Sequence, residues 1–194
     1  MNKRFFDLFF IFLFSPVIIL IIVLIFCFIK ISQPKYNAFY VQQRVGKNGI
    51  LFRMYKFRTM LINMNVGDNA VTTTENDVRI TKLGKFLRKH RLDEFPQFIN
   101  VLIGNMSIVG PRPEQEKFVK KLSKEIPKYM KRHNVKPGIT GLAQIKVGYT
   151  SGEVDEVKHK LKYDLEYIND ISILNDIYIL FKSISVILFG FGSR

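Results

Sequence analysis

Residues 5–29 form an apolar run, "FFDLFFIFLFSPVIILIIVLIFCFI", that constrains the fold more than any other part of the chain. The one charged residue within it is Asp7. At about 1.5 Å of rise per residue, a helix over this run matches a hydrocarbon core roughly 30 Å thick. The run is too long for the apolar part of a signal peptide, and no A-x-A-like cleavage site follows it. The sequence therefore predicts a helix that enters a membrane.

The dipeptide Ser15-Pro16 lies near the middle of this run. Proline has no N–H and clashes with the preceding turn, so it favours a bend, and the Ser15 hydroxyl can bond a carbonyl that the proline frees. Basic residues flank both ends of the run, namely Lys3, Arg4, Lys30 and Lys35. The rule that cytoplasmic ends carry Lys and Arg therefore gives no direction of crossing. These features predict a re-entrant helix-break-helix that dips into one leaflet; a spanning helix, straight or kinked, is the alternative.

The chain as a whole has a formal net charge of +14 and 47% hydrophobic residues. Basicity of this size points to phosphate-bearing partners or an anionic membrane surface, and the apolar fraction exceeds that of a nucleic-acid-binding tail. We therefore expect anionic membrane lipid as a partner and no nucleic acid. Cys27 is the one cysteine, which excludes a disulfide or a cysteine-based metal site within this chain.

The remaining patterns predict an α+β fold that is mainly α. Residues 40–60 predict a small β-hairpin, because "KNG" is a turn signal and "ILFRMYKF" alternates as a strand does. The polar residues 61–80 predict a loop. Residues 81–104 and 116–136 place apolar residues at helical spacing opposite a basic face, which is typical of amphipathic helices at a membrane interface. Residues 158–192 predict two helices joined by a short turn.

Asp93 and Glu94 stand between a cationic run and an apolar one in "HRLDEFPQFINVL", residues 90–102. An acidic pair is favoured by the dipole at the start of a helix, and Pro96 suits a first turn. The functional interpretation is that one carboxylate binds Mg²⁺ or attacks phosphorus while neighbouring arginines neutralise phosphates. The residues alone leave both interpretations open.

Two stiff segments follow this pair. "GPRP" cannot be regular helix or central strand, so it is either a structural loop or a clamp that holds Arg112 for a bidentate phosphate contact. "KPGITGLAQI", residues 136–145, predicts a tight turn whose exposed amides could receive a nucleotide or phosphate. No Walker loop, dinucleotide G-x-G-x-x-G, zinc H-E-x-x-H or Ser-His-Asp order is visible in the sequence.

Three segments, in this order behind the membrane run, resemble the bacterial sugar transferase family, the monotopic phosphoglycosyl transferases: "QQRVGKNGILFRMYKFRTM", "RITKLGKFLRKHRLDEFPQFINVLIGNMSIVGPRP" and "KPGITGLAQ". The resemblance covers nearly the whole chain and corresponds to the small form of the family, without a further multi-span N-terminal domain. It implies a membrane anchor at 1–35 and a compact cytoplasmic catalytic domain at 36–194, with the interfacial helices around it.

The resemblance also implies an activity, the first membrane step of surface glycan or glycoconjugate synthesis. A sugar-1-phosphate passes from a UDP-sugar to a polyprenyl phosphate, with undecaprenyl phosphate the expected acceptor, and UMP is released. The reaction takes place at the cytoplasmic face of the bacterial inner membrane. The motifs specify neither the sugar nor an oligomeric state.

Site residues carry over from the same motifs. The resemblance implies that Asp93 attacks the β-phosphorus to form a phosphosugar-aspartyl intermediate, and that Glu94 helps to bind Mg²⁺ or positions reacting groups. Asp93 and Glu94 are the expected Mg²⁺ ligands. The expected substrate contacts are Lys56, Arg58, Arg88 and Arg112 for the phosphates, and Pro137, Gly138, Thr140, Gly141 and Gln144 near the nucleotide or product phosphate.

Two departures from the family pattern follow "GLAQ". Many relatives continue to an Asn-Gly-Arg segment where this chain has "IKVGYTSGEVDE", and Leu142 replaces a common tryptophan. Lys146 is the nearby substitute that we expect for the missing arginine. Asp164 either matches a familiar acidic position or is a surface helix residue. Two other functions stay open: a membrane-anchored, non-enzymatic binder of anionic lipid, and a glycosyltransferase that moves the sugar alone and releases UDP.

Overall fold

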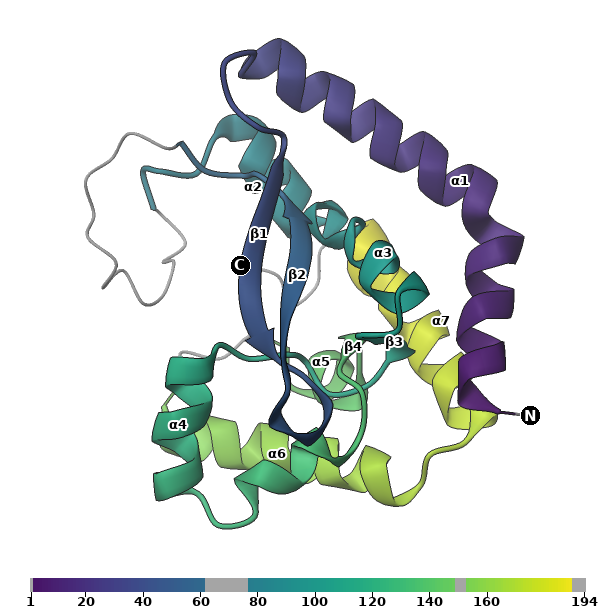
Figure 1. The fold of residues 1–194 in the computed structure, drawn as a ribbon, viewed down its shortest axis with the longest axis vertical. Coiled ribbons are helices and arrows are strands. Elements are labelled where there is room, and N and C mark those ends of the chain that lie inside the picture. The colour runs from purple at the N-terminus through teal and green to yellow at the C-terminus, as the bar shows by residue number, and fades with distance from the viewer. Residues whose placement is uncertain (1, 62–76, 149–152, 190–194) are drawn as a thin grey trace.

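The computed structural model describes residues 2–61, 77–148 and 153–189. This described part of the chain is mostly helical, with two small two-stranded sheets. The long helix α1 (Lys3–Ser32) runs along one edge of the molecule, and the other elements lie on its inner side (Figure 1). The predicted α+β class with mainly helical content is therefore confirmed.

The structure replaces the predicted break in α1 by a bend. α1 is one uninterrupted helix with Pro16 inside it, and it changes direction along its length (Figure 1). Pro16 cannot donate to the carbonyl of Phe12, four residues before it. The Ser15 hydroxyl donates to that carbonyl instead, at 2.8 Å. This substitute hydrogen bond explains why the helix continues where the sequence predicts an interruption.

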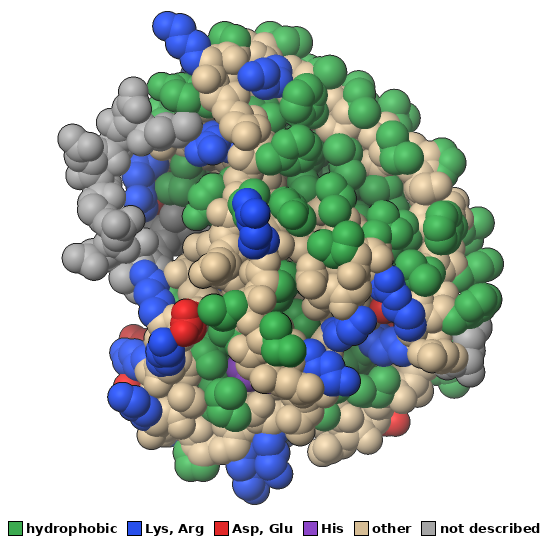
Figure 2. Space-filling model, in the orientation of Figure 1, with side chains coloured by type: hydrophobic (Ala, Val, Ile, Leu, Met, Phe, Trp, Pro, Cys, Tyr) green, Lys and Arg blue, Asp and Glu red, His purple; other side chains and the backbone are tan. Residues whose placement is uncertain are grey.

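α1 buries one narrow stripe and exposes the rest of its apolar surface. It is the one helix in the described part of the chain that is long and apolar enough to cross a membrane. The buried residues face the protein: Phe6, Asp7, Ile11, Ile18, Ile25 and Ile29. Apolar side chains cover much of the molecule along this helix (Figure 2), and an exposed apolar surface of this extent suits contact with lipid.

The predicted hairpin is present. β1 (Phe39–Val45) pairs antiparallel with β2 (Leu51–Phe57) across the turn η1 (Lys47–Gly49). Asn48 and Gly49 both have positive φ, at 56° and 79°, as a tight turn after a strand requires. The alternation in β2 predicted a half-buried strand, and its buried side chains belong to the protein core.

A second, parallel sheet was not predicted. β3 (Ser107–Val109) pairs with β4 (Gly138–Thr140), so the prediction of a tight turn with exposed amides at 136–145 is wrong. The Gly138 amide is used inside the fold, donating to the Pro111 carbonyl at 2.9 Å. A Cβ on Gly138 would lie 2.1 Å from the Gly110 nitrogen, so glycine allows this close approach.

The remaining helical elements surround these sheets: α2 (Lys82–Lys89), η2 (Leu92–Glu94), α3 (Gln97–Leu102), α4 (Glu116–Glu125), η3 (Tyr129–Asn134), α5 (Leu142–Lys146), α6 (Val154–Asn169) and α7 (Ile173–Phe189). The predicted pair of C-terminal helices is therefore confirmed as α6 and α7. Most of the loop predicted at 61–80 lies outside the described residues. At its ends, Met60 and Ile80 form an antiparallel bridge.

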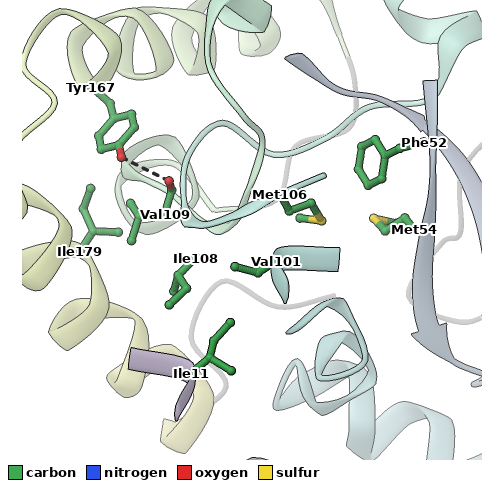
Figure 3. Packing of buried hydrophobic residues seen from close by; sticks show 9 residues of the cluster. All are labelled: Ile11, Phe52, Met54, Val101, Met106, Ile108, Val109, Tyr167 and Ile179. Atoms are coloured by element: carbon green, nitrogen blue, oxygen red, sulfur yellow. Dashed lines mark hydrogen bonds between the residues drawn. The ribbon is translucent and has the colours of Figure 1, made fainter. Parts of the chain in front are cut away.

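One cluster of buried side chains joins the anchor to the sheets. Ile11 of α1 packs with residues of β2, α3, β3, α6 and α7 (Figure 3). A second contact lies near the other end of α1, where Ile25 and Ile29 pack with Phe57 and Leu87. Both ends of the anchor therefore rest on the body of the protein. Apolar side chains of α2 and α3, among them Phe86, Ile99 and Leu102, remain exposed, as the predicted interfacial helices require.

Candidate active site

The acidic pair lies in η2, immediately before α3. Arg91, with φ at 52°, turns the chain out of α2, and Pro96 leads into α3. Asp93 and Glu94 are both buried, with exposed fractions of 9% and 3%. A place before a helix agrees with the helix-start interpretation of the pair. Burial of two adjacent carboxylates goes beyond it, because such groups are seldom buried without cationic partners.

Glu94 is held by two cations from different parts of the chain. Lys56 of β2 places its Nζ 2.7 Å from Glu94 Oε1. Arg112, from the "GPRP" loop, donates through Nη2 to Oε1 at 2.6 Å and through Nη1 to Oε2 at 3.1 Å. Burial alone would raise the pKa of Glu94, but Arg112 and Lys56 outweigh it and hold the pKa well below its usual range. Glu94 is therefore an anion that organises two cations.

Asp93 differs from Glu94 in its hydrogen bonding. Within residues 2–61, 77–148 and 153–189, no hydrogen bond to the Asp93 carboxylate is found, whereas both Glu94 oxygens accept one. Burial raises the pKa of Asp93 to about 6; Glu94 adds to the rise, and Lys56 and Arg88 oppose it. At neutral pH this carboxylate is mainly ionised. An ionised carboxylate that accepts no hydrogen bond from the described residues is suited to act as a nucleophile.

Of the two other predicted phosphate contacts, Arg58 directly follows β2 and Arg88 lies in the last turn of α2. Arg88 of α2 donates through Nε to Thr59 Oγ1 at 2.9 Å, and its charge acts on Asp93. The Arg58 guanidinium donates to the backbone carbonyl of Asn37 at 2.7 Å. Arg88 thus belongs to the electrostatic surroundings of Asp93, whereas Arg58 ties β2 to the start of the hairpin.

A buried ion pair supports Arg112 from behind. Arg132 of η3 donates through Nη2 to the Arg112 carbonyl at 2.9 Å, and the same guanidinium bonds the Asp164 carboxylate at 2.8–2.9 Å. Asp164 is only 4% exposed, so the alternative of a surface helix residue is wrong. Sequence reasoning missed Arg132, because nothing in a run of basic residues marks the one that is buried.

The segment expected near the nucleotide is used largely for packing. Gly141 resembles Gly138, since a Cβ on it would lie 2.2 Å from the Gly110 carbonyl oxygen. The Thr140 hydroxyl lies 2.6 Å from that of Ser183 in α7. Pro137 is buried, and its carbonyl accepts from the Ser107 amide at 2.9 Å. These residues hold β4 against β3 and the "GPRP" loop.

Gln144 is the member of that segment that lines a small hollow next to Arg112, the partner of Glu94. The other lining residues in the described chain are Arg91, Arg112, Gly148 and Lys160. Lys160 of α6, rather than the expected Lys146, brings a further cation to the "GPRP" loop. Burial lowers the pKa of Lys160 to about 8, with repulsion from Arg112 contributing and Glu114 opposing. The predicted residues Asp93, Glu94, Lys56, Arg88, Arg112 and Gln144 thus lie around one region.

The donor set fits Mg²⁺ only with help from a substrate. Carboxylate oxygens are the ligands that this hard cation prefers, and it commonly takes the rest from phosphates and water. In the described residues, no group of three or more His, Cys, Asp or Glu side chains forms a metal cluster. Asp93 and Glu94 could provide carboxylate oxygens, although Glu94 is already bound by Lys56 and Arg112.

Comparison with known proteins defines the class of this chain. The family model described as "Bacterial sugar transferase" matches residues 1–190. The chain therefore belongs to the bacterial sugar transferase family, as the motif resemblance implies. The match runs from the anchor through the acidic pair, the "GPRP" loop and the C-terminal helices.

Individual relatives agree with this assignment. The chain is 46% identical over 182 residues to the UDP-N-acetylgalactosamine-undecaprenyl-phosphate N-acetylgalactosaminephosphotransferase of Aeromonas hydrophila, covering 94% of this chain and 41% of the relative. It is 44% identical over 156 residues to the UDP-glucose:undecaprenyl-phosphate glucose-1-phosphate transferase of Klebsiella pneumoniae, covering 79% and 33%. It is 36% identical over 204 residues to the undecaprenyl-phosphate galactose phosphotransferase of Salmonella typhimurium, covering 96% and 40%. The chain thus spans a third to two fifths of the length of these relatives.

Proposed function

We propose that this protein transfers a sugar-1-phosphate from a UDP-sugar to a polyprenyl phosphate, undecaprenyl phosphate being the expected acceptor, and releases UMP. One observation carries the proposal: two adjacent buried carboxylates, of which Glu94 is bound by Lys56 and Arg112 while Asp93 is left unbonded within the described chain. The relatives' names supply the substrate classes, and their different sugars keep the sugar itself open.

The reaction has two displacements at one phosphorus. In the first, an ionised oxygen of Asp93 attacks the sugar-bearing β-phosphorus, the bond from this phosphorus to the α-phosphate oxygen breaks, and UMP leaves. In the second, an oxygen of the lipid phosphate attacks the same phosphorus and breaks the aspartyl bond, which regenerates Asp93. Two steps let two bulky anions use the site in turn rather than together.

Cations around Asp93 offset the charge of the diphosphate. Lys56 and Arg112 are held close by Glu94, and Arg88 approaches from α2. Groups fixed in place before the reaction stabilise charge on the transferring phosphoryl group without having to reorganise. Mg²⁺, when bound by Asp93 or Glu94 together with substrate phosphates, would supply further positive charge to the same oxygens.

α1 places this chemistry at a membrane. Its exposed apolar surface and its bend at Pro16 support a re-entrant anchor that holds the site at the cytoplasmic face of the bacterial inner membrane. Single cysteines at Asn2 and Lys35, in a Cys27→Ser background, test the topology with impermeant maleimide. We expect labelling of both from the cytoplasmic side; labelling from opposite sides would establish a spanning helix.

The activity is tested with the full chain in lipid nanodiscs, Mg²⁺, undecaprenyl phosphate and a panel of UDP-sugars. We expect UMP release, a loss of at least about 10³-fold in Asp93→Asn because the nucleophile is gone, and no change in the exposed control Asp155→Asn. A UDP-sugar labelled in the sugar should also leave label on the wild-type protein before acceptor is added. Release of UDP would identify a sugar-only transferase, and no turnover with any donor would favour a lipid-binding protein.

A further inference from the structure

Asp7, the one charged residue in the apolar run, is hydrogen-bonded to β3, the strand that leads to the active site. Asp7 as a residue is only 2% exposed. The Ser107 hydroxyl lies 3.0 and 2.8 Å from its two oxygens, and the Ile108 amide donates to Oδ1 at 3.1 Å. A buried carboxylate is costly unless it is bonded in this way. These contacts therefore define one rotation and one depth of α1 against β3.

A second series of polar contacts joins α1 to Val109, the residue after Ile108 in β3. Lys3 pairs with Asp176 of α7 at 2.5 Å. The Tyr167 hydroxyl donates to Asp176 Oδ1 at 2.7 Å. It also lies 3.2 Å from the Val109 carbonyl oxygen (Figure 3). Both connections start within the first turns of the anchor, and both end on β3.

β3 continues directly into the loop that carries Arg112. The Gly110 amide donates to the Thr140 carbonyl at 2.8 Å, and two residues later Arg112 forms its paired hydrogen bonds with Glu94. The five residues from Ile108 to Arg112 span no more than about 17 Å when extended, and Pro111 among them leaves the segment little slack. A shift of β3 is therefore passed to the Arg112 backbone.

We propose that Asp7 is a positioning residue for the reaction: seating of the membrane helix on β3 through Asp7 sets the position of Arg112 beside the acidic pair. The anchor then not only holds the protein at the lipid but also completes the active site. This inference rests on the proposed function. It differs from a purely structural contact because the loss of Asp7 acts on catalysis through Arg112.

The first test is Asp7→Ala, which removes the contacts with Ser107 and Ile108, in the full chain in nanodiscs and measured as UMP release per folded molecule. We expect kcat to fall about 10- to 100-fold, as for a small misplacement of a catalytic group, with KM for the UDP-sugar changed less than about 3-fold. Ser107→Ala, which keeps the Ile108 contact, should show a smaller fall, and the exposed Ser123→Ala should show none. An unchanged kcat per folded molecule in Asp7→Ala would overturn the proposal.

The second test asks whether Asp7 acts through Arg112. In an Arg112→Lys background, whose bidentate contact with Glu94 is already lost, we expect Asp7→Ala to lower kcat by less than about 2-fold. If the two losses multiply instead, Asp7 acts by another route and the proposal fails.

A third measurement is independent of turnover. Hydrogen exchange at the Ile108, Gly110 and Arg112 amides should become faster in Asp7→Ala, while exchange in the β1–β2 hairpin stays unchanged. Equal exchange in both proteins would show that Asp7 does not hold β3. If the wild-type protein releases no UMP from any donor, the proposed function fails, and the exchange experiment still decides whether the anchor holds this strand.

Discussion

Residues 110–113, "GPRP", and 137–141, "PGITG", are both rich in glycine and proline and lie side by side in the fold, yet they serve different purposes. The first carries Arg112, whose guanidinium reaches Glu94 and whose carbonyl receives Arg132. The second carries no charge, and its glycines allow its backbone to approach Gly110 closely. One segment therefore carries the charge, and the backbone of its neighbour keeps that segment in place.

Removing the support on the "GPRP" side should have the largest effect. Arg132→Met leaves the Asp164 carboxylate buried without its partner and the Arg112 carbonyl without this donor. Breaking a buried ion pair from one side typically costs about 3–5 kcal/mol, so we expect the free energy of unfolding to fall by that amount. Thermal and urea unfolding in nanodiscs measure the change.

The double variant Arg132→Met/Asp164→Leu separates the unpaired charge from the lost contact with Arg112. We expect it to recover part of the stability, because no buried carboxylate remains, but not the activity, because the Arg112 carbonyl still lacks its donor. A loss below about 1 kcal/mol in the single variant would show that this pair does not hold the loop.

Removing the close approach on the "PGITG" side should have a smaller effect. A Cβ at Gly138 meets backbone atoms of Gly110 that cannot move independently, so Gly138→Ala should destabilise the fold by about 1–3 kcal/mol. Gly49→Ala is the matched control: its φ of 79° is unfavourable for alanine, but no atom lies within 4 Å of the added methyl group. We expect about 1 kcal/mol there, and equal losses in both variants would contradict the packing argument.

The β1–β2 hairpin was predictable from the sequence, whereas the β3–β4 pair was not. The hairpin follows from local signals, since "KNG" defines the turn and "ILFRMYKF" the alternation next to it. β3 and β4 have three residues each and are far apart in the sequence, so no local period marks them. Their pairing depends on Gly110 and Gly138 meeting, a property of the folded chain alone.

Some residues of the candidate site were predicted from the sequence and others were missed. Asp93, Glu94 and Arg112 belong to compact motifs, and the structure brings these three together. Arg132 and Lys160 were missed because charged residues on amphipathic helices usually face solvent, and only the packing of η3 and α6 shows which ones turn inward. At Pro16 the local signal correctly predicted a bend but also predicted a break in the helix. The helix continues because the Ser15 hydroxyl donates to the carbonyl that Pro16 cannot bond.

The smallest effect is expected at Lys160, the cation that replaces the expected Lys146 beside Gln144. If it attracts the donor phosphates, Lys160→Met should raise KM for the UDP-sugar by about 10-fold, or about 1.4 kcal/mol of binding free energy, with little change in kcat. Lys158→Met on the same helix is the control, because its side chain is half exposed and pairs with Asp155.

The pH dependence of KM for the UDP-sugar gives a further test of Lys160. Because the pKa of Lys160 is about 8, its positive charge is present at pH 7 and is lost as the pH rises through 8. KM of the wild-type protein should therefore rise between pH 7 and 9, whereas Lys160→Arg, which stays charged, should remain flat over this range. Lys160→Met should also be flat, but at the higher KM, because the group that titrates is gone. A wild-type rise that persists unchanged in Lys160→Met would assign the titration to another group and leave Lys160 outside the binding site.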